Sequence, residues 1–233
     1  YNFFYAHGQI NTHRALPPPK QLETDKKGKI KKKTYYRWET MVSKLIKQES
    51  FGTAKLIFGN PTASFNAEKN KWTFGSRSGY EIFLFQKPSA CFIWEGTIVV
   101  EGMGKLGLVC DMDENGNGYF ISFDVSKGIT KIRTWGFNPL NVRENFIFKD
   151  LQAAIFPLTE NRTFSFRLVR YGSYIELSID GVVKLTLMDY TFSDKGIGLY
   201  SASSIISLKK SVLKVLPDPK EEYASPDETQ QII

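Results

Sequence analysis

Short apolar stretches separated by turn residues run through most of this sequence. Between about Phe51 and Leu216, apolar and aromatic runs alternate with Gly, Asn, Asp and Ser. Many short strands with regular turn signals are typical of antiparallel sandwiches and barrels. The pattern therefore predicts an all-β fold, with strands at 54–58, 71–74, 80–85, 90–101, 105–111, 119–125, 130–135, 163–170, 174–179, 183–187, 196–201 and 207–216.

The first 47 residues show a different pattern. The aromatic-rich stretch 1–8 predicts a short strand, and residues 9–33 predict a connector, because three successive prolines, 17–19, cannot donate ladder hydrogen bonds. Residues 37–48 predict one short helix, since their apolar side chains follow helical spacing: Trp38, Met41, Val42, Leu45 and Ile46. We expect three parts: a strand, Pro/Lys-rich linker and helix over 1–47, a β-sandwich over 48–216, and a flexible tail over 217–233.

The hairpin around Asp180 and Gly181 can be given a register. Alternate residues are apolar in both of its strands, and a two-residue turn would put the two apolar sets on opposite faces. We therefore expect a three-residue loop over 180–182, which pairs position 179 with 183, 177 with 185 and 175 with 187. The other face of the first strand would carry Tyr174, Glu176 and Ser178 toward water or a ligand.

The two cysteines, Cys91 and Cys110, are expected to be reduced and buried. If strands 90–101 and 105–111 form a hairpin, Cys110 faces Gly96, five residues along the strand from Cys91. That offset is roughly 16 Å at 3.3 Å per residue, whereas a disulfide spans about 5.5 Å between Cα atoms.

Composition and charge narrow the class of protein. The 233 residues are 42% hydrophobic and 24% charged, which is typical of a globular protein with a core. The net charge of +7 is concentrated in residues 14–47, which carry +8 and leave −1 for the rest. A basic run of this kind is typical of a solvated hairpin or linker, and no nucleic-acid motif or membrane-length apolar run accompanies it. We therefore expect neither nucleic acid nor membrane as a partner.

The sequence offers no complete catalytic or metal-binding motif. The stretch from Asp111 to Gly118 resembles the start of a calcium loop, but Ser122 stands where an EF-hand needs a bidentate Glu. Asp111 and Asp113 could reach the spacing of an inverting glycosidase, yet they sit at a turn with nothing to raise the pKa of one of them. His7 and His13 are too close to the N-terminus for a triad. We expect no catalytic residue, metal or cofactor in this chain.

Two groups of residues together resemble glycoside hydrolase family 32. The aromatic stretch 1–8 resembles the last strand of that family's propeller, and Arg14 to Ile30 resembles the linker that follows it. Residues 166–181 and 196–200 resemble the family's C-terminal concanavalin A-like sandwich, in which Ser173 and Glu176 fit an Asp-x-Ser-x-x-Glu pattern. Tyr171 replaces the Asp of that pattern, and none of the family's catalytic motifs occurs here.

The resemblance implies a two-sheet, concanavalin A-like (jelly-roll) sandwich that is a non-catalytic C-terminal module of a glycosidase of fructans, sucrose or a related glycan. Its partners would be the catalytic propeller and, at an accessory site, a glycan; a homodimer through the N-terminal strand is a further expectation. A secreted or periplasmic location would follow from the resemblance alone. The candidate sugar contacts are Trp94, Tyr119, Arg133 and Trp135, as aromatic or hydrogen-bonding side chains. Two alternatives stay open: a free-standing lectin-like carbohydrate-binding module, and a sandwich-fold hydrolase that uses Asp111 or Asp113.

Overall fold

The computed structural model describes residues 17–47, 55–59, 64–66, 69–85, 90–137, 147–156, 163–193 and 196–218. The strand expected at 1–8, both histidines and most of the expected C-terminal tail lie outside these residues.

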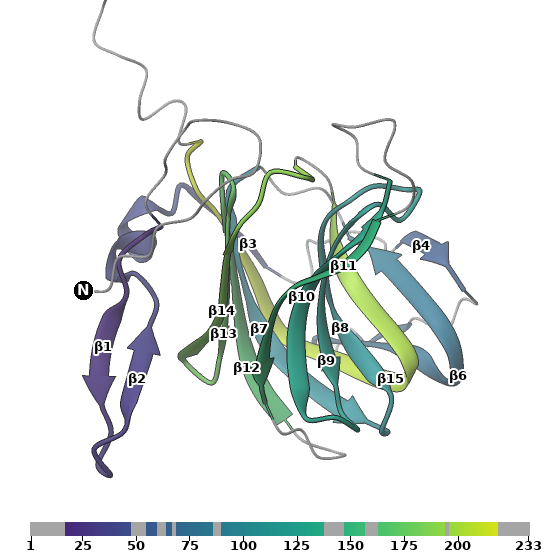
Figure 1. Ribbon diagram of the computed structural model, residues 1–233. Helices are drawn as coiled ribbons and strands as arrows, with labels where there is room; N and C mark the ends of the chain where they lie inside the picture. The colour runs from purple at the N-terminus through teal and green to yellow at the C-terminus, as the bar shows by residue number, and fades with distance from the viewer. Residues whose placement is uncertain are drawn as a thin grey trace, which may run out of the picture.

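One long antiparallel sheet, folded onto itself, forms the body of the molecule (Figure 1). The central path is β11 (Ile147–Ile155), β10 (Ile129–Gly136), β9 (Gly118–Asp124), β8 (Lys105–Met112), β15 (Gly196–Val215), β7 (Phe92–Glu101), β12 (Thr163–Tyr171), β13 (Tyr174–Ile179) and β14 (Val182–Met188). On the other edge of β15 lie β6 (Lys71–Leu84), with β4 (Lys55–Phe58) and β5 (Ser64–Asn66) beside it, and β3 (Lys44–Lys47). The prediction of an all-β sandwich is confirmed.

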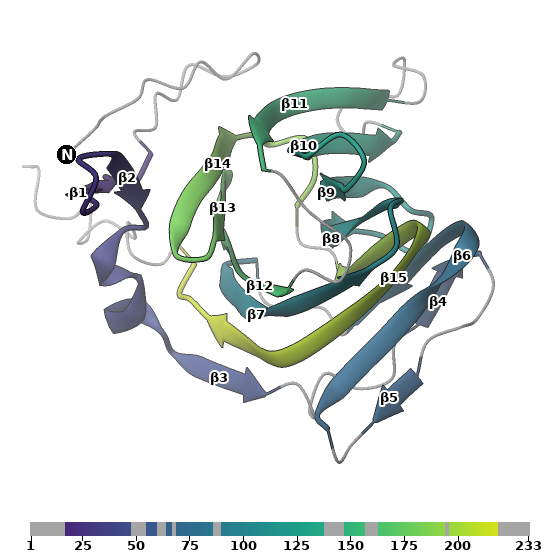
Figure 2. The ribbon, with the colours of Figure 1, turned by 90° about the horizontal axis from the view of Figure 1, so that it is seen from below.

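The strand β15 belongs to both layers of the sandwich. Residues 196–202 pair with β8 and residues 205–215 pair with β7. The change of partner coincides with a register shift after Ala202, where Ser203 has a φ of 55°, and the paired strand β6 turns at Gly75 and Gly79 (φ 107°). We call β8–β11 with the first half of β15 sheet A, and β7 and β12–β14 with its second half sheet B. Figure 2 shows the two sheets curving around one interior, so that β14 returns toward β11.

The core fills the space between the inner faces of the two sheets. Strand β10 illustrates the alternation: Ile132 points inward and is fully buried, whereas its neighbours Lys131 and Arg133 point outward and are half-buried. At the open side, the Thr186 backbone N–H of β14 donates a hydrogen bond to Gln152 Oε1 of β11, at 2.6 Å. This alternation decides which side chains of sheet A face solvent, and therefore where a site can form.

The expected helix over 37–48 is wrong in its second half. A short 3-10 helix, η1, spans Tyr36–Met41, and the chain turns extended at Val42 (ψ 116°). The next residues form β3, which pairs with residues 212–215 of β15. The free edge of β15 offers hydrogen bonds that a helix could not use, and Ile46 packs against the core from β3.

The hairpin around Asp180 has a two-residue turn, so the expected three-residue loop is wrong. Ile179 pairs with Val182, and Asp180 and Gly181 both have positive φ values, 48° and 71°. A register shift between Leu177 and Ser178 then restores the expected pairs 177 with 185 and 175 with 187.

The expectation that the other face of this hairpin meets water or a ligand is also wrong. Tyr174, Glu176 and Ser178 are buried. The cause is the N-terminal segment, because Lys20 pairs with Glu176 at 3.2 Å and Trp38 packs on Tyr174.

The cysteines are free and buried, as predicted, but for a different reason. β7 and β8 form no hairpin, because β15 lies between them in the sheet. Several strands were not expected: β11, β5, and the separate hairpin of β1 (Gln21–Thr24) and β2 (Ile30–Lys33). Each of β6 and β15 unites two of the expected strands. The turn expected in the connector is present, closed by a hydrogen bond from the Gly28 N–H to the Asp25 carbonyl at 2.9 Å.

Candidate functional site

A groove opens on the outer face of sheet A. It encloses about 140 Å³ and is lined by Tyr80, Lys105, Phe120, Ser122, Arg133, Trp135, Phe148 and Tyr200. Phe120, Ser122 and Tyr200 are buried and form its floor, whereas Phe148, with 53% of its surface exposed, stands at its rim. The side chains come from β6, β8, β9, β10, β11 and β15, so the groove crosses the whole sheet.

The strand register explains why a hollow forms here. Across neighbouring strands, Lys131 pairs with Ser122, Ser122 with Gly107, and Gly107 with Tyr200. Gly107 has no side chain, so the row is empty between Ser122 and Tyr200. A Cβ atom at Gly107 would lie 2.0 Å from the Ile121 carbonyl oxygen, which means that the close strand approach requires glycine.

Aromatic rings form a continuous cluster along the groove. Trp135 packs edge-on against Phe148, with ring centroids 5.1 Å apart, and meets Phe120 at 5.6 Å with the two rings tilted by 51°. Tyr200 meets Phe120 at 5.1 Å and Tyr80 at 5.3 Å. These contacts fix the ring orientations before any ligand arrives.

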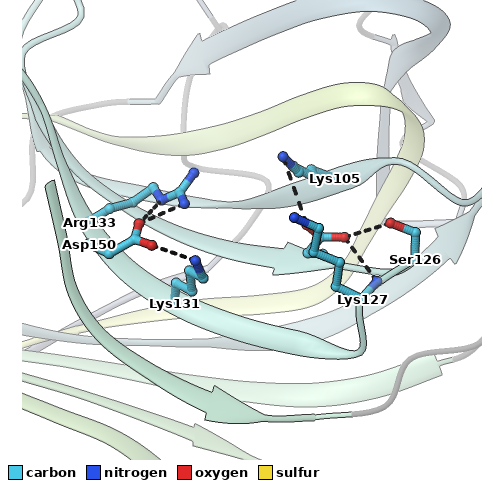
Figure 3. A network of polar contacts seen from close by, with 7 residues as sticks. Lys105, Ser126, Lys127, Lys131, Arg133 and Asp150 are labelled. Carbon is cyan, nitrogen blue, oxygen red and sulfur yellow. Dashed lines mark hydrogen bonds and ion pairs between the residues drawn. The ribbon is translucent and has the colours of Figure 1, made fainter. Parts of the chain in front are cut away.

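A charged cluster holds Arg133 at one side of the groove (Figure 3). Asp150 Oδ1 accepts from Arg133 Nε at 2.8 Å and lies 2.6 Å from Arg133 Nη2, and Lys131 donates to Asp150 Oδ2. The guanidinium also lies 4.7 Å from the Phe148 ring centroid. Burial alone would raise the pKa of Asp150, but its hydrogen bonds from Lys131 and Arg133 lower it, so the carboxylate stays ionised.

A second charged cluster lies at Lys105. Its Nζ is 3.8 Å from Asp124 Oδ2. The other oxygen of Asp124 accepts from Ser126 Oγ at 2.9 Å and from the Lys127 backbone N–H at 3.1 Å. Asp124 is thus anchored to its own turn and orients Lys105 toward the groove.

Two tyrosines line the groove, and their hydroxyls have no hydrogen-bond partner among the described residues. Tyr80 and Tyr200 make only ring contacts there. Burial raises the pKa of Tyr80 to about 12 and that of Tyr200 further, while the nearby charge of Arg133 acts in the opposite direction. Both phenols are therefore neutral at physiological pH and able to donate or accept.

The structure brings two of the four expected sugar-contact residues together. Arg133 and Trp135 both line the groove. Trp94 and Tyr119 instead lie in the core with 0% exposure, where Trp94 Nε1 donates to Ser211 Oγ at 2.7 Å and the Tyr119 hydroxyl donates to Asp189. They cannot reach a ligand in the groove.

The alternation of residues along the strands could have distinguished a groove residue, such as Trp135, from a core residue, such as Tyr119. Along its strand, Trp135 shares a face with the charged residues Lys131 and Arg133, whereas Tyr119 shares one with Ile121 and Phe123. The alternation of side chains along a strand therefore places Trp135 on the solvent-facing side and Tyr119 on the core side. The missed lining residues are Tyr80, Lys105, Phe120, Ser122, Phe148 and Tyr200; Phe148 lies on a strand that the pattern did not reveal.

The carboxylates weighed for hydrolysis have structural partners. Asp111 Oδ2 lies 2.7 Å from Arg170 Nε, with both side chains 2% exposed. Asp113 accepts from the backbone N–H groups of Asn115 and Asn117 at 2.9 Å, which closes the β8–β9 turn. Within the described ranges there is no group of three or more His, Cys, Asp or Glu that could hold a metal, and no helix long and apolar enough to cross a membrane.

Comparison with known proteins defines the class of fold. No family model matches the sequence, and neither does any curated protein. Solved structures do match: the carbohydrate binding module CBM66 from Bacillus subtilis has a TM-score of 0.58 and 18% identity over 69% of this chain and 94% of that one. A Bacillus subtilis protein of unknown function with a galectin-like fold has a TM-score of 0.54 and 11% identity, covering 73% and 92%.

An enzyme contains a similar unit. The Aspergillus kawachii beta-fructofuranosidase, complexed with glycerol, matches with a TM-score of 0.54 and 12% identity over 85% of this chain but only 33% of its own. At these identities the likeness concerns the fold. The chain is a jelly-roll sandwich of the type found in carbohydrate-binding and galectin-like modules.

Proposed function

We propose that this chain is a carbohydrate-binding β-sandwich module that holds a sugar in the groove of sheet A. The observation that carries the proposal is the groove itself, where fixed aromatic rings lie beside hydrogen-bonding side chains. The C–H faces of a sugar ring pack on aromatic surfaces, and its hydroxyls need donors and acceptors nearby.

The size of the groove indicates how much of a glycan it would hold. Its volume of about 140 Å³ is well below the roughly 300 Å³ at which pockets for drug-sized ligands begin. We therefore expect one sugar ring to be enclosed, with the rest of the glycan crossing the rim at Phe148.

The fold comparisons support this proposal. A matching solved structure is named a carbohydrate binding module, and another is a fructofuranosidase. The fructofuranosidase match covers 85% of this chain against 69% for the binding module, which indicates that it extends beyond the sandwich. This favours the finer proposal that the module is the C-terminal, non-catalytic part of a family 32-like glycosidase whose propeller it would contact.

A hydrolase that uses Asp111 or Asp113 has less support. Both carboxylates are occupied, Asp111 by the buried Arg170 and Asp113 by backbone donors of its own turn. Neither lines the groove.

The proposal is tested by binding of the full chain to a glycan array, followed by titration calorimetry with the glycans that bind. Phe148→Ala removes an exposed rim ring and should weaken binding about fivefold or more, taking as a guide the roughly 1–3 kcal/mol that a base stacked on an aromatic side chain contributes in nucleic-acid sites. Tyr36→Ala is the matched control, because Tyr36 is equally exposed (54%) but lies on η1, which packs on sheet B. Absence of binding to any glycan would contradict the proposal, as would equal losses in the two variants.

A further inference from the structure

The polar groups of the groove are unbalanced in favour of donors. Three cationic side chains, Lys105, Lys131 and Arg133, face two carboxylates, Asp124 and Asp150. These five side chains sum to +1, and only the cations Lys105 and Arg133 line the groove, although the chain outside residues 14–47 has a net charge of −1.

The two carboxylates are engaged by neighbouring groups and neither lines the groove. Asp150 receives three donors, two from Arg133 and one from Lys131. Asp124 receives Ser126 and Lys127 on one oxygen and faces Lys105 with the other. The described side chains that line the groove therefore include no carboxylate to accept from the hydroxyls of a neutral sugar, which are donors as well as acceptors.

Donor capacity is left over on the cations. The contacts of Arg133 use Nε and Nη2, so Nη1 has no acceptor among the described residues. Lys105 Nζ, at 3.8 Å from its carboxylate, lies beyond hydrogen-bond distance. Ser122 lines the floor at 3% exposure, and its hydroxyl, like that of Tyr200, has no hydrogen-bond partner within the described ranges.

These donors are held in place. Asp150 and the ring of Phe148 fix the guanidinium of Arg133 from two sides. Ser122 on β9 and Tyr200 on β15 lie in one row on either side of Gly107 on β8, while Arg133 comes from β10, beyond Ser122, and Lys105 stands two residues from Gly107 along β8 itself. An acceptor-only group placed above Gly107 would meet donors from both sides.

We infer that the groove selects a sugar bearing an anionic group, a carboxylate or a sulfate, which Arg133 and Lys105 bind from opposite sides while the ring packs on the aromatic cluster. The inference rests on the proposed function and adds the chemical class of the ligand. Charge-assisted hydrogen bonds from a guanidinium or ammonium to such a group are shorter and roughly twice as strong as neutral ones.

The test uses matched pairs of short oligosaccharides with the full chain. Trisaccharides of galacturonate, glucuronate and mannuronate are compared with their methyl esters, which keep the ring and lose the charge. Sulfated and unsulfated galactose trisaccharides distinguish sulfate from carboxylate. We expect one acidic probe to bind about tenfold more tightly than its neutral counterpart, and the difference to shrink in about 1 M salt, where the screening length is roughly 3 Å.

Two sets of variants locate the binding. Lys105→Gln and Arg133→Gln should each remove most of the preference for the acid. The double variant Lys26→Gln/Lys27→Gln removes charge from the exposed turn of the β1–β2 hairpin and should leave the preference unchanged.

The outcomes are distinguishable. Equal binding of charged and neutral members, with both weakened by Phe148→Ala, would overturn the inference and leave the proposed function standing. A preference lost only in the hairpin variant would also overturn the inference, because the anion would then bind outside the groove. If neither these probes nor any neutral glycan binds, the proposed function fails and the inference fails with it.

Discussion

Two arginines show how the position of a single residue decides its role. Arg133 lies on the outer face of β10, has no acceptor for Nη1 among the residues that the structure describes, and borders a groove. Arg170 has 1% exposure and is enclosed by Asp111, the Phe192 carbonyl and the ring of Tyr119. The first arginine is available to a ligand, whereas the second supports the fold.

Arg170→Met should strongly destabilise the protein. It leaves Asp111 buried without its cation, which costs about 3–5 kcal/mol of the free energy of unfolding. Urea denaturation measures the loss. Arg37→Met, at an exposed arginine whose Nε donates to the hydroxyl of the neighbouring Tyr36 at 3.0 Å, should change stability by no more than about 0.5 kcal/mol. Similar losses of stability in both variants would contradict the claim that Asp111 depends on its buried arginine.

Four tyrosines make the fold sensitive to alkali. Burial raises the pKa of Tyr80 to about 12 and the pKa of Tyr119, Tyr174 and Tyr200 further above the usual value of 10.0. The unfolded chain therefore loses phenolic protons at lower pH than the folded chain does. The stability from these groups is complete below pH 10 and is lost as the pH rises from 10 through about 12.

Thermal melts across this range, with tyrosinate absorbance recorded in parallel, measure the effect. Tyr80→Phe should make the fall in melting temperature less steep. Ionisation of all the tyrosines at about pH 10 in the folded protein would contradict the prediction.

At the scale of the element, close strand packing shapes the groove. Gly107 lets β8 approach β9 and leaves the middle of the groove open. Gly107→Ala should lower the free energy of unfolding by about 1–3 kcal/mol, because its Cβ would lie 2.0 Å from a backbone oxygen. The same variant should weaken glycan binding.

Gly116→Ala is the comparison for that variant. Gly116 has nothing within 4 Å of a Cβ, and only its φ of 84° disfavours a side chain. Gly116→Ala should lower the free energy of unfolding by about 1–2 kcal/mol and leave glycan binding unchanged. Urea denaturation and calorimetry give the two readouts; unchanged binding in Gly107→Ala would place the ligand elsewhere.

The segment 17–47 contacts the sandwich through η1 and β3. Trp38, with 1% exposure, packs between Tyr171 and Tyr174, and β3 extends the sheet. Trp38→Ala should lower the free energy of unfolding by about 3–5 kcal/mol, whereas Tyr36→Ala should lower it by less than about 1 kcal/mol. Rapid proteolytic trimming up to Lys47 with the remainder still folded would contradict this packing.

The sequence pattern predicted the strands well where polar and apolar residues alternate. It predicted them poorly where the secondary structure of a segment depends on the strand with which it pairs. The segment 44–47 has helical spacing, yet the open edge of β15 makes it a strand. The pairing of β15 with both β7 and β8 could not be predicted, because the bend at Ser203 depends on tertiary contacts. Arg133 and Trp135 could be predicted as groove residues from their residue types. Tyr80 and Lys105 could not, because their place in the groove depends on which strands are neighbours, and the sequence does not show this.

At the scale of the whole molecule, the outer faces of the two sheets differ. The N-terminal segment covers sheet B through Trp38, and ion pairs from Glu39 to Arg167 and Lys214 bind it there. Sheet A keeps its aromatic groove open. On the proposed function, sheet A would present its outer face to a ligand, while the outer face of sheet B is covered by the chain's own N-terminal segment.

The central claim is that a sugar binds on the outer face of sheet A, and NMR titration of the labelled chain tests it most directly. A saccharide that binds should shift the Trp135 indole N–H and the backbone amides around Ser122 and Arg133, while the indoles of Trp38 and Trp94, buried elsewhere, stay unchanged. Shifts concentrated on the β1–β2 hairpin or on η1 would contradict the claim.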